Sequence, residues 1–205
     1  MGDGGVAVLT FASPIANGPG WDFAVFENSF DGRFLELAFV EVSSDGIHYQ
    51  RFPSVSLTQT NTQVGSWGLL DPTYIYNLAG KYAAGYGTPF DLEEIKDINP
   101  LVDVTRITHV RIIDVVGCLN DAYCSYDSQG NKINDPWPTP FGTGGFDLDA
   151  VGVRHKKTLW ADNNGDGIVN LKDFARLSGL YPEQTDWIDD LLDEWLLTES
   201  WYQGQ

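Results

Sequence analysis

The chain has 205 residues, 42% of them hydrophobic and 13% aromatic, which is enough to bury the core of one medium-sized domain with a small appendage. Its 12 Lys and Arg residues against 29 Asp and Glu residues give a net charge of -17. That charge excludes nucleic acids as partners and disfavours anionic membranes. The chain contains no run of about 18 apolar residues, so it has no segment that could span a bilayer as a helix. The many carboxylates instead favour divalent cations.

The first 155 residues show the pattern of short strands joined by Gly- and Pro-containing turns. Alternating or short apolar runs predict strands over 6–11, 23–26, 34–43, 48–52, 107–116 and 146–153. Asp45-Gly46 predicts a tight hairpin turn, and Asp91 caps a single helical turn over 91–95. No helical pattern lies between the strands, so a doubly wound α/β fold is excluded. The sequence predicts a mainly β fold, an antiparallel β-sandwich or jelly roll.

Composition and periodicity both change near residue 157. Residues 158–205 hold ten acidic and two basic side chains, and the apolar residues of 187–196 recur at helical spacing. We therefore predict a β-sandwich domain over 1–157 and a small helical tail over 158–205.

The most specific motif is an EF-hand-type loop in this tail. Gly167 stands at loop position 6, where the chain must turn sharply. Positions 1, 3, 5, 7, 9 and 12, which ligate calcium in such loops, are Asp162, Asn164, Asp166, Ile168, Asn170 and Asp173. The spacing predicts a Ca²⁺ site followed by an exit helix that includes Phe174. The alternative is an acidic turn that binds no ion.

The loop and its exit helix, over 162 to about 178, resemble one repeat of a dockerin module. Dockerins usually carry two such loops, and here a second helix at about 185–197 follows without a second loop. The resemblance implies a secreted protein and a cohesin-like partner. The alternative is that the tail packs on its own domain.

Five stretches of the first domain resemble a family of secreted bacterial cell-surface proteins. The stretches are 17–28, 36–43, 78–81, 87–92 and 144–152. The resemblance implies a β-sandwich at an extracellular or cell-surface location and says little about activity. Relatives usually carry further chain before the first strand, so we expect an open sheet edge here. Strand addition from another copy or a partner protein could complete that edge, and the alternative is a covering loop.

Further acidic residues of the first domain are candidates for a second cation site. Asp22 and Glu27 flank one strand, and Asp147 lies near the start of the last one. A second candidate set in the long loop consists of Asp127, Gln129, Asn131 and Asp135. The alternative for both sets is turn capping and solvated carboxylates.

The two cysteines, Cys118 and Cys124, are close together in a polar segment. We expect them to form a disulfide, with two free thiols as the alternative. Two cysteines and three histidines give no plausible four-ligand zinc set.

No catalytic constellation stands out, because no carboxylate pair is singled out and no Gly-x-Ser-x-Gly elbow occurs. The sequence therefore favours a non-enzymatic, extracellular, calcium-binding structural or adhesion protein that assembles with other subunits or tethers to them. The alternative is a carbohydrate-binding module that stacks glycans on exposed aromatic residues such as Trp67 and Trp137.

Overall fold

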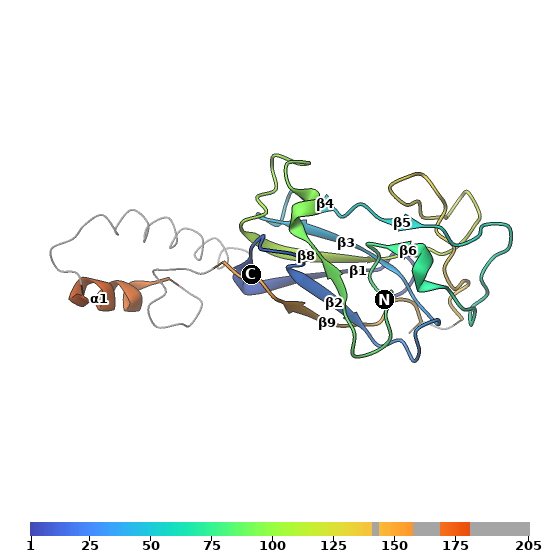
Figure 1. Ribbon diagram of the computed structural model, residues 1–205, viewed down its shortest axis with the longest axis horizontal. Coiled ribbons are helices and arrows are strands. Elements are labelled where there is room, and N and C mark those ends of the chain that lie inside the picture. The colour runs from blue at the N-terminus through green and yellow to red at the C-terminus, as the bar shows by residue number, and fades with distance from the viewer. Residues whose placement is uncertain (141–143, 158–168, 181–205) are drawn as a thin grey trace. The chain divides into compact units, whose positions relative to one another are not determined.

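The computed structural model describes residues 1–140, 144–157 and 169–180 (Figure 1). The chain divides into two compact units, Met1–Lys156 and Lys157–Gln205, and the first is called the β unit below. Within the described residues, no helix is long and apolar enough to cross a membrane.

The β unit contains two main antiparallel sheets. The first has the order β1 (Val6–Ile15), β8 (Ile107–Asp114), β3 (Ala38–Ser43), β4 (Gln50–Arg51). The second has the order β7 (Thr88–Phe90), β2 (Phe23–Glu27), β9 (Leu148–Val153). A small third sheet pairs β5 (Val55–Ser56) with β6 (Ile75–Tyr76). The described helices are two 3-10 turns, Pro72–Tyr74 and Leu92–Ile95, and α1, Leu171–Leu180. The prediction of a mainly β, antiparallel fold is confirmed.

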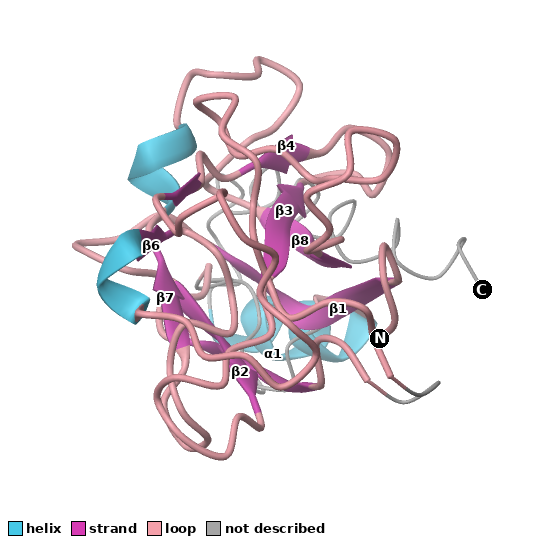
Figure 2. Ribbon diagram, turned by 90° about the vertical axis from the view of Figure 1, so that its right-hand side faces the viewer, coloured by secondary structure: helices cyan, strands magenta, loops and turns pink. Residues whose placement is uncertain are grey.

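The main core is built from both large sheets, which lie side by side in the end-on view (Figure 2). The contribution of the first sheet is clear in β8, whose residues alternate between buried and half-buried along most of the strand, as expected when one face packs on a core. Three aromatic rings from different elements meet in this core. Phe23 lies 5.5 Å from Phe90 and 5.8 Å from Phe52, measured between ring centroids.

A second, smaller core lies beneath the long loops and contains Leu35, Leu37, Leu70, Ile75, Leu78, Val115 and Ile133. Leu35 and Leu37 were predicted within a strand over 34–43, but β3 begins only at Ala38. Their side chains are nevertheless fully buried, because the chain before β3 packs against this second core.

The strand registers define two opposite ends of the β unit. One end, here the exit end, is marked by the pairs Ile15–Lys156, Phe23–Val153 and Ser43–His109. The other, here the distal end, is marked by the pairs Val6–Ile113, Glu27–Leu148 and Ala38–Asp114. The chain leaves the β unit at the exit end, after Lys156.

Candidate functional site

Three aromatic rings lie in a row at the distal end, and together they are called the aromatic ladder. Phe30 and Phe34 have ring centroids 6.3 Å apart and planes inclined by 31°. Phe34 and Trp67 are 5.8 Å apart with planes inclined by 26°. Phe30 is 87% exposed and Trp67 is 62% exposed. The ladder therefore presents large apolar rings to solvent in a defined arrangement.

Hydrogen bonds fix the loop that carries the two phenylalanines. One carboxylate oxygen of Asp31 accepts the backbone N–H groups of Arg33 and Phe34, each at 2.8 Å. The hydroxyl of Ser29 donates to the carbonyl of Asp31 at 2.6 Å and contacts that of Phe34. The N–H of Ser29 in turn donates to the carboxylate of Glu27 at 2.9 Å, which ties the loop to the end of β2.

Neighbouring loops are joined to this one through the backbone. The N–H of Leu70 donates to the carbonyl of Arg33 at 2.7 Å, which connects the loop of Trp67 to that of the phenylalanines. The N–H of Ala84 donates to the carbonyl of Ser29 at 2.9 Å. The loops that carry the rings are thus joined to one another and to β2.

Trp137, which was paired with Trp67 in the sequence-based prediction, is half-buried on an adjacent loop. The backbone N–H of Trp137 donates to the carbonyl of Val64 at 3.1 Å, and the Ser66 hydroxyl donates to the carbonyl of Pro138 at 2.5 Å. Trp67 itself stacks on Phe34. Sequence reasoning missed Phe30 and Phe34, although the Asp31-Gly32 turn between two aromatic residues was a usable signal.

The three acids proposed as a second cation site do not come together. Asp22 lies at the exit end and is fully buried. Its carboxylate accepts the N–H groups of Gly18 and Leu92, each at 2.7 Å, and lies 2.8 Å from Nδ1 of His155. Glu27 is the last residue of β2 and lies at the distal end of the β unit. Among the described residues, no group of three or more His, Cys, Asp or Glu side chains is arranged to hold a metal ion.

Buried carboxyl groups at the distal end have raised pKa values. Burial raises the pKa of Glu27 to about 7, and the nearby Glu36 and Asp147 add to the effect. Burial also raises the pKa of Asp114 to about 7, and that of Glu36 is raised for the same main reason.

Two of these acids hold the start of the last strand in place. Glu36 accepts the N–H of Gly145 at 2.9 Å, and Asp114 accepts that of Phe146 at 3.2 Å. Glu36 precedes β3 and Asp114 ends β8, so these contacts join the two main sheets at the distal end.

The residues of the long loop that were proposed as another cation site belong to two separate groups of contacts, one around Asp127 and one around Asp135. Burial alone would raise the pKa of Asp127, but bonds from Ser56, Asn131 and Gln129 lower it. Its carboxylate accepts their backbone N–H groups at 2.8–2.9 Å, so it organises a turn. Asp135 instead accepts the N–H of Leu37 at 3.0 Å, and burial raises its pKa well above the usual value.

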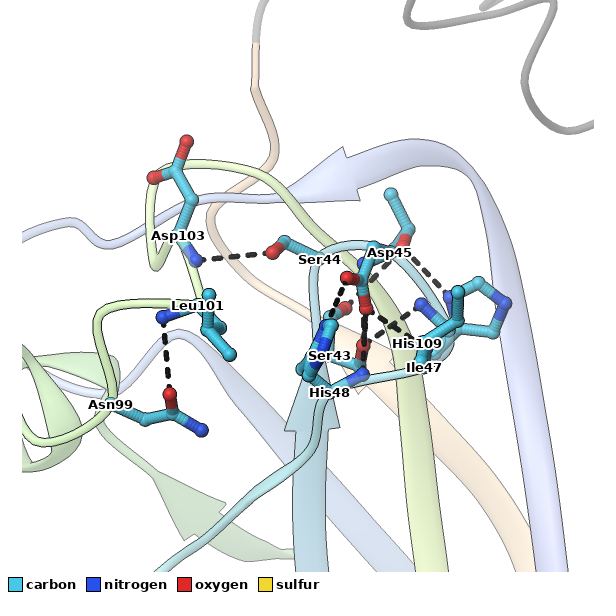
Figure 3. Close-up of polar contacts among 11 residues, drawn as sticks. Ser43, Ser44, Asp45, Ile47, His48, Asn99, Leu101, Asp103 and His109 are labelled. Atoms are coloured by element: carbon cyan, nitrogen blue, oxygen red, sulfur yellow. Dashed lines mark hydrogen bonds and ion pairs between the residues drawn. The ribbon is translucent and has the colours of Figure 1, made fainter.

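The turn between β3 and β4 at the exit end contains a serine, an aspartate and a histidine in contact (Figure 3). Asp45 lies 2.7 Å from Nδ1 of His48 and accepts the hydroxyl of Ser43 at 3.0 Å. A catalytic serine requires the imidazole between the serine and the carboxylate, whereas here Asp45 lies between the other two and Ser43 is fully buried.

The same turn is stabilised as a structural unit. Asp45 accepts the N–H groups of Ile47 and His48, each at 2.8 Å. Burial would raise the pKa of Asp45, but these bonds and that from the His48 ring hold it far below its usual range. His109 packs against Gly46, where a Cβ would lie 2.9 Å from its Cε1 atom. The contacts of Ser43, Asp45 and His48 in Figure 3 therefore fix a hairpin turn.

The predicted disulfide is not formed in the structure, where Cys118 and Cys124 are both free. The buried Sγ of Cys118 accepts the N–H of Asn120 at 3.4 Å. Cys124 instead interacts with the hydroxyl of Tyr126 and raises its pKa. The two thiols thus have different partners.

The calcium loop is described only at its end. Asp162, Asn164, Asp166 and Ile168 lie outside the described residues. The N–H of Asn170 donates to the carboxylate of Asp173 at 3.0 Å, and the side chain of Asn170 accepts the N–H of Lys172 at 2.9 Å. These reciprocal bonds cap α1, which begins at Leu171.

Comparison of the chain with models of protein families, with curated proteins and with solved structures finds no match.

Proposed function

We propose that this chain is a non-enzymatic, extracellular, calcium-binding structural or adhesion protein. In this proposal the β unit is a β-sandwich that assembles with other subunits through strand addition. The dockerin-like tail binds Ca²⁺ and tethers the protein to a cohesin-like partner. The observation that carries the proposal is the open edge of β1.

β1 has the properties of a strand that accepts another strand. It lies at the edge of its sheet, where its partner over Val6–Thr10 is β8. Its ten residues include no charged side chain, and Val6 and Val8 are 56% and 50% exposed. Edge strands that avoid association are usually short, charged, covered, or interrupted by a proline or a bulge. In β1 the register shift and Pro14 come after Thr10, so the regular open stretch is Val6–Thr10. In a chain of net charge -17, this uncharged edge is a surface where two copies can approach without direct repulsion.

The calcium part of the proposal is supported by the loop sequence and by the contacts at its end. Asp173, the last residue of the motif, is fully buried in the first turn of α1, and Val169 is 1% exposed. Several carboxylates converging on one point would repel each other without a cation, so ion binding should order the tail.

Strand addition is tested by the molar mass of the full chain, measured by light scattering after size exclusion in millimolar calcium. We expect a species larger than the 22.7 kDa monomer. Val8→Lys places a charge on the edge and should yield the monomer. Ile47→Lys, at a 77% exposed position in the β3–β4 turn, is the matched control and should assemble normally. A monomer at every concentration of the unmodified chain would exclude strand addition.

Calcium binding is tested separately by thermal melting in calcium and in excess chelator. The chelator should lower the melting temperature of the unmodified chain, and Asp166→Ala should abolish the difference. An identical melt with and without chelator would contradict the calcium site and leave the assembly result unaffected.

A further inference from the structure

The aromatic ladder is a second candidate surface, separate from β1 and from the tail. Single exposed hydrophobic residues are ordinary on protein surfaces, but contiguous apolar patches mark binding sites. Phe30 and Trp67 are mostly exposed although each is large enough to fill a core position. Phe34 joins them into one continuous row.

The ladder is also preorganised, which a binding site requires and a chance cluster does not. Asp31 and Ser29 fix the loop of Phe30 and Phe34 by hydrogen bonds to its backbone. The bond from Leu70 to Arg33 fixes the distance to the loop of Trp67. A ligand therefore meets rings carried on loops whose backbone loses little freedom when it binds.

The shape and surroundings of the ladder indicate the class of ligand. An amphipathic helix needs an apolar groove, and strand addition needs a free backbone edge. Here the rings stand on loops, and the backbone N–H groups of Arg33, Phe34 and Leu70 are already bonded within the protein. The mostly exposed rings of Phe30 and Trp67 instead match the flat C–H faces of sugar rings, whose hydroxyl groups can remain in water.

The net charge of the protein narrows the class of ligand further. A net charge of -17 repels acidic polysaccharides and leaves neutral ones unaffected. We propose that the aromatic ladder of Phe30, Phe34 and Trp67 binds a neutral glycan chain, with its sugar rings packed against the exposed surfaces of Phe30 and Trp67.

Native gel electrophoresis of the full chain through gels containing one soluble neutral polysaccharide each tests this directly. The probes are xyloglucan, mixed-linkage β-glucan, arabinoxylan, galactomannan and amylopectin. At least one should slow the migration of the unmodified protein. Phe30→Ala and Trp67→Ala should each weaken that retardation about tenfold or more, as truncation of a central aromatic contact does.

Two controls separate glycan binding from other effects. Trp21→Ala removes a 42% exposed tryptophan at the exit end, which stacks with Arg154, and should leave retardation unchanged. Val8→Lys should also leave it unchanged, because the ladder is separate from the β1 edge. Phe30→Ala should remain folded, since its ring is 87% exposed. Lack of retardation by every polysaccharide, or equal retardation of Phe30→Ala and the unmodified chain, would overturn the proposal.

Discussion

Glu27→Gln should stabilise the protein above pH 7 and leave its stability unchanged near pH 4. Glu27 ends β2 with only 2% of its surface exposed, and burial raises its pKa to about 7. Its carboxylate accepts one backbone N–H, that of Ser29. Glutamine keeps an acceptor for this bond and cannot ionise, so the substitution removes the charge while preserving the shape.

The size of the effect follows from the difference in pKa between the folded and unfolded states. Between pH 4.5 and about 7, folded Glu27 keeps a proton that the unfolded chain has released, so stability falls as pH rises through this window. At about 1.4 kcal/mol for each tenfold change, the rise from 4.5 to about 7 corresponds to up to about 3 kcal/mol at pH 8. For a unit of this size that is a rise in melting temperature of roughly 6–12 °C.

Thermal melting followed by circular dichroism, from pH 4 to pH 8 in excess chelator, measures this difference. Glu93→Gln is the matched control, because bonds from Asn17 and Lys96 lower the pKa of this exposed residue. Glu93→Gln should cause a small loss of stability at pH 8, whereas Glu27→Gln should cause a gain. A melting temperature of Glu27→Gln equal to or below that of the unmodified protein at pH 8 would refute the reasoning. So would a gain that persists unchanged at pH 4.

Two further substitutions test the framework of the β unit. Asp22→Ala should destabilise the protein by about 3–5 kcal/mol in urea unfolding, because it leaves the buried N–H of Leu92 and the half-buried N–H of Gly18 unpaired, whereas Asp22→Asn should retain part of that stability. Gly80→Ala should cost several kcal/mol, because its φ is 84° and a Cβ would lie 1.9 Å from the carbonyl oxygen of Glu36. Gly85→Ala, at φ 88° with open space around it, should cost only about 1 kcal/mol. Equal losses at the two glycines would show that the close approach is not what requires Gly80.

The strands predicted from sequence are those whose side chains carry a strong local pattern. β8 alternates between buried and half-buried residues over most of its length, and its predicted range of 107–116 covers Ile107–Asp114. β5, β6 and β7 were missed because they are two or three residues long. β7 also contains Pro89, which argues against a strand. Such elements form through tertiary pairing, as β7 does with β2, and a local pattern does not reveal them.

The candidate site was predictable only in part for the same reason. The exposure of Trp67 was expected, but its stacking on Phe34 depends on two loops that are joined by a backbone bond. That one ion cannot bind both Asp22 and Glu27, two of the three acids proposed for a second cation site, could have been seen from sequence alone. An extended chain of five residues separates its ends by about 16 Å, too far for one ion to bind both carboxylates.

The positions of these features suggest a division between the two ends of the β unit. At the exit end, Asp22 and His155 join the start of β2 to the segment through which the chain leaves, so the proposed tether would begin at a well-fixed end of the β unit. The aromatic ladder lies at the distal end, where Glu27 anchors its loop through Ser29. A protein attached through its C-terminal segment would therefore keep its proposed glycan surface at the end of the β unit opposite the point of attachment.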